Sequence, residues 1–217
     1  MAPPSPTAAD LLGALPEALR TLAERGVQRS YRKGTLIIEE GSHGDTVYLL
    51  LRGQVRAFSS DARGREVTYG VYGAGDYFGE MSLDGGPRAA SVVAEIACIC
   101  VVLTRQSLRE HIAAEPEFAF ELIGRVIRRA RLATQSARSM ALLDVYGRVV
   151  QLLESLAVVQ ADGTRVIAER LTHAEIAARV GCSREMVSRL MKDLTQGGFV
   201  TADRICIALR GTLPRGW

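Results

Sequence analysis

The sequence lacks any long apolar run, and no stretch approaches the roughly 20 residues that a membrane-spanning helix requires. Its first residues, MAPPSPTAAD, contain neither the basic region nor the apolar region of a secretory signal, and they are typical of a short disordered lead-in. The two absences argue against integral membrane proteins and exported proteins. We therefore expect no membrane partner and a cytoplasmic location.

Cysteine and histidine are scarce, with four cysteines and three histidines among 217 residues. No CxxC, HxH or HExxH motif occurs and the histidines are far apart, so we predict neither a metal site nor a haem site. Without clustered metal ligands a jelly-roll enzyme is disfavoured, and we predict that the protein is not an enzyme. Cys98 and Cys100 are interpreted as reduced, buried residues on one face of a strand.

What the sequence does contain begins with a region rich in glycine. Eleven of the 21 glycines lie between Gly34 and Gly86, and they separate short runs of strand-forming residues such as TVYLLLRG and EVTYGVYG. Strands at this close spacing with glycine turns predict an antiparallel sandwich or barrel. The apolar run 92–103, rich in Val, Ile and Cys, is expected to form a pair of buried strands.

Residues 115–143 are expected to form one long helix followed by a hinge near Leu143–Asp144. Pro116 suits the first turn of the helix, and Asp144 is expected to cap the helix that follows. Small and apolar residues recur along one narrow seam at spacings of three and four: Leu122, Val126, Ala130, Ala133, Ala137 and Met140. A seam this narrow favours contact with a second copy of the helix, and packing against the chain's own β domain is the alternative.

The strongest pattern is LTHAEIAARVGCSREMVSRLMKDLTQGGFV, residues 171–200. Thr172 and Glu175 have the spacing of a capping box, Gly181 permits a left-handed turn, and Ser183 can cap a second helix. The side chains expected to be exposed near the start of that helix are Arg184, Glu185, Ser188 and Arg189. This is the arrangement of a helix-turn-helix whose second helix reads the major groove of DNA.

The charge of the C-terminal region agrees with a DNA partner. From Thr172 to Trp217, seven Lys and Arg residues face four Asp and Glu residues, which leaves a net charge of +3. The segments GGFV and ICIAL, which follow the second helix, are expected to form a wing hairpin.

Three segments, GDYFGEMSL…PRAAS, MALLDVYGRV and VGCSREMVSRLMKDL, resemble the cyclic-AMP receptor protein/FNR superfamily of bacterial transcription regulators. The resemblance covers the chain from about Tyr31 to its end. It implies an α+β fold with a jelly-roll-like antiparallel β-roll effector domain in residues 1–114. A dimerisation helix and hinge would occupy residues 115–143, and a winged helix-turn-helix would occupy residues 144–217.

The resemblance also implies partners and DNA-contacting residues. It implies a homodimer that binds a palindromic double-stranded DNA operator, with RNA polymerase as a further partner. Thr172 and Ser183 lie in the implied DNA-binding surface together with Ser188. Arg184, Glu185 and Arg189 match the residues that read bases, and each half-site is expected to resemble TGTGA.

In the members that bind cyclic nucleotides, the ribose and phosphate contacts match Gly79, Glu80 and Arg88. Ala89 stands where the family carries a Ser or Thr that also contacts the phosphate. The loop between Glu80 and Arg88 is a residue or two shorter than the family's. Thr134 is the hydroxyl residue retained where the best-known member has two hydroxyl residues touching the base.

The effector implied by this match is a cyclic nucleotide, with cAMP as the expected one. A non-nucleotide effector and the absence of any ligand are the alternatives. In the latter case Glu80 and Arg88 would pair with each other or with the surface of the roll, and the DNA-binding function would be constitutive.

Overall fold

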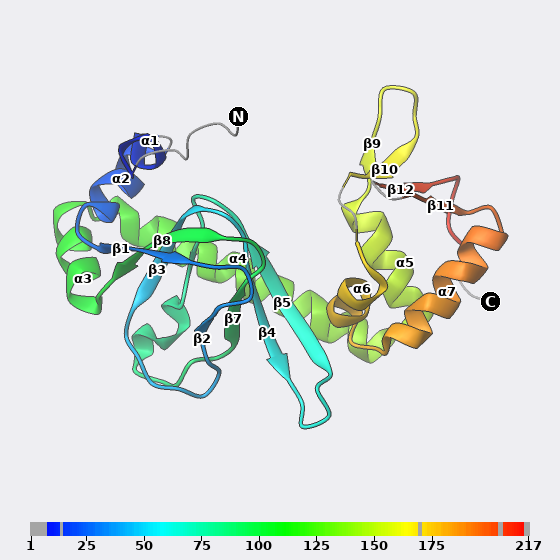
Figure 1. Ribbon diagram of the computed structural model, residues 1–217, viewed down its shortest axis with the longest axis horizontal. Helices are drawn as coiled ribbons and strands as arrows, with labels where there is room; N and C mark the ends of the chain where they lie inside the picture. Colours follow the sequence, from blue (N-terminus) through cyan, green and yellow to red (C-terminus); the bar gives the residue numbers. More distant parts are fainter. Residues whose placement is uncertain (1–7, 14, 169–170, 204–205, 215–217) are drawn as a thin grey trace. The chain divides into compact units, whose positions relative to one another are not determined.

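The structure, a computed structural model, describes residues 8–13, 15–168, 171–203 and 206–214 (Figure 1). Residues 1–7, the start of the expected lead-in and of the predicted 1–114 domain, lie outside this range. The chain divides into two compact units, one made of residues 1–59 and 68–130 and the other of residues 60–67 and 131–217. Among the described residues, no helix combines the length and the apolar character needed to cross a membrane.

Two four-stranded sheets form the β part of the first unit, in the orders β1-β8-β3-β6 and β2-β7-β4-β5. Neighbouring strands pair in antiparallel fashion. The strands are β1 (Val27–Tyr31), β2 (Leu36–Ile38), β3 (Val47–Arg52), β4 (Val55–Ser60), β5 (Glu66–Tyr72), β6 (Tyr77–Phe78), β7 (Ser91–Ala94) and β8 (Cys98–Leu103). The predicted antiparallel β-roll is confirmed.

The apolar run 92–103 forms two strands, but they do not pair with each other. β7 pairs with β2 and β4, whereas β8 pairs with β1 and β3 in the other sheet. The chain leaves one sheet and enters the other between the two strands, and both strands contribute to the core between the sheets, where Val92, Cys98 and Cys100 are buried. The two cysteines are free and buried, as predicted.

Helices cover the outer face of the β1-β8-β3-β6 sheet. Leu22 of α2, Leu108 of α3 and Phe118 of α4 share one hydrophobic core with Leu49 and Leu103 of the sheet. The helices are α1 (Ala8–Gly13), α2 (Glu17–Ala23), α3 (Arg105–Ala114) and α4 (Glu117–Leu142). Sequence reasoning missed α1 and α2, since it interpreted the N-terminal residues only as a lead-in.

The long helix α4 agrees with the predicted helix and belongs partly to each unit, with residues 117–130 in the first and 131–142 in the second. Phe118 is buried and Leu122 packs against the first unit's core, and contacts between the helix and the β domain continue as far as Arg129. Residues 130–138 are all exposed, and Val126 and Met140 of the predicted seam are 42% and 46% exposed.

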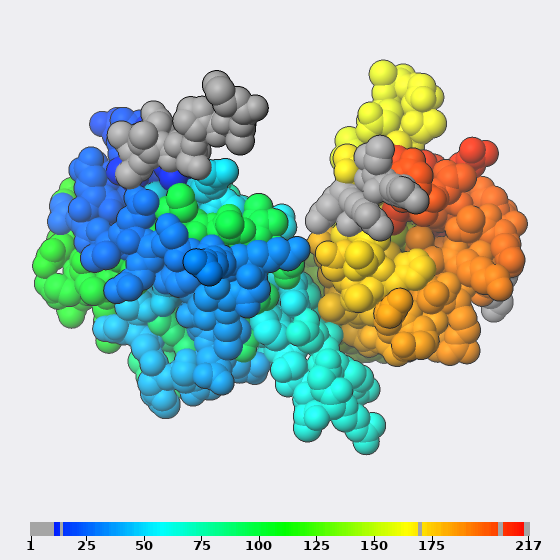
Figure 2. Space-filling model, viewed as in Figure 1, coloured from blue at the N-terminus to red at the C-terminus, as the bar shows by residue number. Residues whose placement is uncertain are grey.

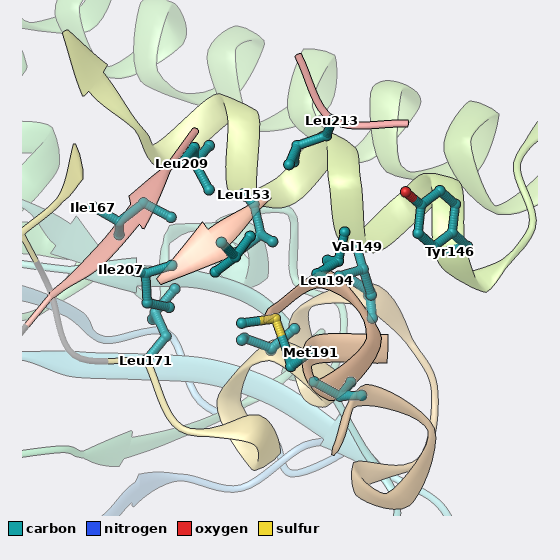
Figure 3. Close-up of a cluster of buried hydrophobic side chains, with 14 of the residues drawn as sticks. Tyr146, Val149, Leu153, Ile167, Leu171, Met191, Leu194, Ile207, Leu209 and Leu213 are labelled. Carbon is teal, nitrogen blue, oxygen red and sulfur yellow. The ribbon is translucent and has the colours of Figure 1, made fainter. Parts of the chain in front are cut away.

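The second unit contains three helices and a four-stranded sheet in the order β11-β12-β10-β9. The elements are α5 (Val145–Leu156), β9 (Val158–Val159), β10 (Arg165–Ile167), α6 (His173–Val180), α7 (Arg184–Gln196), β11 (Val200–Ala202) and β12 (Ile207–Leu209). Side chains from α5, α7 and the strands meet in one hydrophobic cluster (Figure 3). β11 and β12 form the predicted antiparallel wing, and Asp144 caps α5 by accepting from the Gly147 amide at 2.7 Å.

Candidate effector pocket and DNA-binding surface

Arg88 is a buried cation with no counter-ion among the described residues. Its side chain lies beside the short helix η1 (Glu80–Asp84), and the residue is only 6% exposed. Nη1 donates to the Gly79 and Thr46 carbonyls at 2.8 and 2.9 Å and to Ser82 Oγ at 2.8 Å, while Nη2 donates to Thr46 Oγ1 at 2.8 Å. These acceptors are all neutral, and no described carboxylate pairs with the guanidinium. A buried charge held this way favours an anionic partner.

Gly79 makes this arrangement sterically possible. Its φ is +86°, a left-handed conformation that glycine adopts without strain. A Cβ at this position would lie 2.9 Å from both Arg88 Nη1 and the Thr46 carbonyl. The predicted site residue Gly79 therefore provides space for the arginine.

Glu80 is buried and pairs with the long helix rather than with Arg88. Its Oε1 lies 2.5 Å from Arg129 Nη1, and its side chain is 2% exposed against 22% for Arg129. Arg129 also donates to the Tyr77 carbonyl and stacks over the Tyr72 ring at 4.4 Å. The second oxygen, Glu80 Oε2, is buried without a hydrogen-bond partner among the described residues. A hydroxyl donor from a ligand would satisfy this oxygen.

Sequence reasoning missed Arg129, which lies 49 residues from its carboxylate partner. Its position in the sequence could have indicated it. Arg129 lies one helical turn before Ala133, close to Thr134, the predicted effector contact on the same helix.

The structure brings Gly79, Glu80 and Arg88 together in one segment of the first unit. Ala89 follows Arg88 with its side chain exposed. Thr134 is also exposed, and it lies in the part of α4 that belongs to the second unit.

The helix-turn-helix has the predicted capping contacts. Thr172 Oγ1 accepts from the Glu175 amide at 3.2 Å, and Glu175 Oε2 accepts from the Thr172 amide at 2.6 Å. Gly181 ends α6 with a φ of +67°, and Ser183 Oγ accepts from the Met186 amide at 3.2 Å to begin α7. These contacts satisfy backbone groups at the helix ends and fix where each helix begins.

The predicted DNA-contacting residues lie at the start of α7, apart from Thr172, which caps α6, and both helices reach the surface of the second unit (Figure 2). All six residues are exposed: Thr172, Ser183, Arg184, Glu185, Ser188 and Arg189. The opposite face of α7 is buried through Val187, Met191 and Leu194. Met186 and Leu190, which were expected to be buried, are only half-buried, because the buried stripe runs through Val187 and Met191.

The charge at the start of α7 includes one carboxylate. Hydrogen bonds from its own backbone amide and from Ser183 hold the pKa of the Glu185 carboxyl below its usual value, so the side chain is ionised at neutral pH. An ionised Glu can accept a hydrogen bond from a cytosine amino group, and the neighbouring arginines can donate hydrogen bonds to guanine. Arg204 and Arg215, which contribute to the charge of this region, lie outside the described residues.

Comparison with known proteins identifies both halves of the chain. Residues 28–115 match the cyclic nucleotide-binding domain, and residues 147–213 match the Crp-like helix-turn-helix domain. The cAMP-activated global transcriptional regulator CRP of Salmonella typhimurium is 30% identical over 189 residues, covering 84% of this chain and 89% of that protein. The chain belongs to the CRP/FNR superfamily. The predicted α+β class and the family resemblance are thereby confirmed.

Two further proteins extend the comparison, one by sequence and one by fold. The CRP-like cAMP-activated global transcriptional regulator of Mycobacterium tuberculosis is 32% identical over 192 residues, covering 87% of this chain and 86% of that protein. The c-di-GMP responsive regulator CLP of Xanthomonas campestris superposes with a TM-score of 0.78 at 24% identity, over 90% of this chain and 99% of that one. This CRP/FNR protein is a transcription regulator with a nucleotide-binding-type domain and a DNA-binding domain, and it is not an enzyme.

Proposed function

We propose that this CRP/FNR protein is a homodimeric regulator that binds a palindromic operator under the control of a cyclic nucleotide held in the β-roll. The observation that carries the proposal is that one segment holds two buried polar groups, each lacking a suitable hydrogen-bond or ion-pair partner. Among the described residues, Arg88 is a buried cation bound only to neutral acceptors, and Glu80 Oε2 is a buried acceptor without a donor. A ligand with an anionic phosphate and a free hydroxyl suits both groups.

We propose cAMP as the effector because the Salmonella and Mycobacterium relatives are described as cAMP-activated. Ala89 lacks the hydroxyl that the family uses beside the phosphate, and a lost neutral hydrogen bond costs about 0.5–1.5 kcal/mol. The two charged anchors, Glu80 and Arg88, remain. A non-nucleotide effector is the second candidate, and the missing hydroxyl at Ala89 is the observation that favours it.

The coupling between effector and DNA would run through α4. Arg129 joins this helix to Glu80, so a ligand hydroxyl that bonds Glu80 shares the carboxylate with Arg129. Binding would therefore change the contacts of α4 and, through the hinge near Leu143–Asp144, bias the DNA-binding unit. Such a shift requires the effector to bind the DNA-competent state more tightly than the other state.

Dimerisation through α4 is supported by apolar side chains that the single chain leaves exposed. Phe120, Ile123 and Ile127 recur at helical spacing, with exposures of 70%, 52% and 45%. A continuous apolar stripe on a long helix is expected to be covered by a second copy. Sedimentation equilibrium is expected to give twice the chain mass. RNA polymerase remains a predicted partner.

The test of the DNA-binding assignment uses a duplex with two TGTGA half-sites about 34–36 Å apart, titrated with and without cAMP and cGMP. Replacement of Arg184 by Ala is expected to weaken operator binding by about 1–3 kcal/mol and to relax specificity at one base pair. Arg32→Ala removes the same charge from an exposed site in the other unit and serves as the control.

The DNA-binding assignment and the cyclic-nucleotide effector can be refuted separately. Unchanged operator binding by Arg184→Ala would show that α7 is not the reading helix. Unchanged operator affinity with both nucleotides, together with no calorimetric heat, would overturn the cyclic-nucleotide effector and leave the DNA-binding assignment intact.

A further inference from the structure

His111, on α3, is a titratable residue in the interior of the first unit. It is fully buried, and neither ring nitrogen has a hydrogen-bond partner among the described residues. The neutral ring leaves one donor and one acceptor unsatisfied, whereas the protonated ring would leave two donors and a positive charge unsatisfied. The closed packing around His111 therefore strongly favours the neutral ring.

The ring of His111 lies at the junction between α3 and α4. It packs edge-on against the ring of Phe118, with the two centroids 4.8 Å apart. Phe118 is the buried residue of α4, and its ring centroid lies 6.2 Å from that of Tyr77 in β6. The Glu115 amide donates to the His111 carbonyl at 2.8 Å, and this bond ends α3 just before α4 begins. His111 therefore contacts the side chain that anchors the start of α4 to the β-roll.

The charged groups near His111 on α2 and α3 form no ion pair with its ring among the described residues. Burial is the main cause that lowers the pKa of His111, while the Glu115 carboxylate raises it and the Arg25 guanidinium lowers it. Glu115 accepts from Thr21 Oγ1 at 3.2 Å. Arg25 lies 4.0 Å from Glu110 in an exposed pair, and such pairs contribute little to stability. The apolar packing, rather than these polar contacts, holds the junction closed.

The titratable groups of α4 and of the sheet also leave His111 without a counter-ion in the described part of the chain. Glu117 of α4 is exposed, and Glu121 pairs with Arg125 at 3.1 Å. In the sheet, burial raises the pKa of Tyr77 to about 12, so its hydroxyl stays neutral in the pH range where a histidine titrates. A proton on His111 would therefore be uncompensated in the closed junction, and its charge would favour a conformation in which the ring reaches water.

We propose that His111 is a proton-controlled switch at the start of α4. While its ring is neutral, Phe118 and the first turns of α4 pack on the β-roll. When the junction opens locally, the ring reaches water and binds a proton, and the charged ring then opposes closing, so mild acid increases the population of the open form. A consequence for the effector rests on the proposed function: Arg129 lies on the same helix, so opening would also weaken its ion pair with Glu80.

Hydrogen exchange of the full-length protein, followed by mass spectrometry on peptides from α3 and α4, measures this opening once the intrinsic pH dependence of exchange is corrected. Between pH 7.5 and pH 5.5 the opening constant is expected to rise by up to about tenfold, since pH 5.5 is one unit below the usual histidine pKa of about 6.5. His111→Leu and His111→Gln cannot bind the proton, and each should make the opening independent of pH. His43→Gln and His173→Gln remove the other two histidines and are the matched controls, which should keep the rise.

Three results would overturn the inference. They are an equal pH dependence in the wild type and both His111 variants, a loss of the pH dependence in His43→Gln or His173→Gln, and an equal rise in exchange across both units at pH 5.5. The last result would show general acid unfolding instead of opening at the junction. Neither cAMP nor operator DNA is present in the measurement, so the proposed function can fail or stand independently of the switch.

Discussion

Replacing Arg129 is expected to destabilise the protein more than replacing its ion-pair partner Glu80. Arg129→Met would leave a carboxylate whose side chain is 2% exposed without its cation, and neither oxygen would have a hydrogen-bond partner among the described residues. Removing one partner of a buried pair costs about 3–5 kcal/mol. Since Arg129 is itself 22% exposed, solvent reaches that side of the pair, and we expect about 3 kcal/mol, the lower end of the range.

The reverse substitution, Glu80→Gln, is expected to cost less. Arg129 would keep the Tyr77 carbonyl, the Tyr72 ring and its partial access to water, and the new amide oxygen can still accept from it. The expected loss is about 1 kcal/mol, the net contribution of an ordinary hydrogen bond. The double variant Arg129→Met/Glu80→Gln is expected to be more stable than Arg129→Met alone, because it contains no unpaired buried charge.

Scanning calorimetry of the full-length protein measures these differences as shifts in the unfolding transition of the first unit. At roughly 4 °C per kcal/mol, Arg129→Met should lower the Tm by about 12 °C and Glu80→Gln by about 4 °C. Arg128→Met, at an exposed neighbouring position without an ion pair among the described residues, is the control. An effect of Glu80→Gln equal to or larger than that of Arg129→Met would refute the reasoning, since it would mean that the carboxylate is not the buried member.

Two further predictions concern other sites. His111 is fully buried with neither ring nitrogen hydrogen-bonded to described residues, and burial lowers its pKa from 6.5. The folded state therefore has its full contribution from neutral His111 above pH 6.5. As the pH falls below 6.5 the unfolded chain binds the proton first, so the free energy of unfolding decreases until the pH passes the folded pKa. His111→Leu should reduce this pH dependence in urea titrations at pH 5 and pH 7.5, and an unchanged pH dependence would mean that another group causes it. Thr172→Ala removes the capping box and should destabilise the second unit by about 1 kcal/mol in calorimetry, whereas Thr172→Ser should retain most of that stability.

Local signals in the sequence predicted the helix-turn-helix correctly. Thr172, Gly181 and Ser183 act within three or four residues of their own position, so the spacing of residue types is enough to identify their contacts. The half-buried Met186 shows the limit of this reasoning, because a periodic pattern does not determine how the helix is rotated against its neighbours.

Contacts between distant segments could not be predicted in this way. The ion pair between Glu80 and Arg129 depends on how α4 lies against the roll, and nothing near Glu80 in the sequence indicates an arginine 49 residues later. The same limit explains the run 92–103, where residue composition indicates buried strands but contains no information about which sheet each strand joins. The family resemblance supplied Glu80 and Arg88 as site residues, and the structure added the groups that surround them.

The positions of the four cysteines provide a native chemical probe. Cys98 and Cys100 are buried inside the β-roll, whereas Cys182 and Cys206 of the DNA-binding unit are only partly buried. Burial raises the thiol pKa of all four, so accessibility to the reagent is what distinguishes the two pairs. An alkylating fluorophore should therefore label the folded protein on the DNA-binding unit and leave the roll unmodified. Cys182 lies in the turn between α6 and α7, so a label there would sense the approach of DNA without any engineered residue.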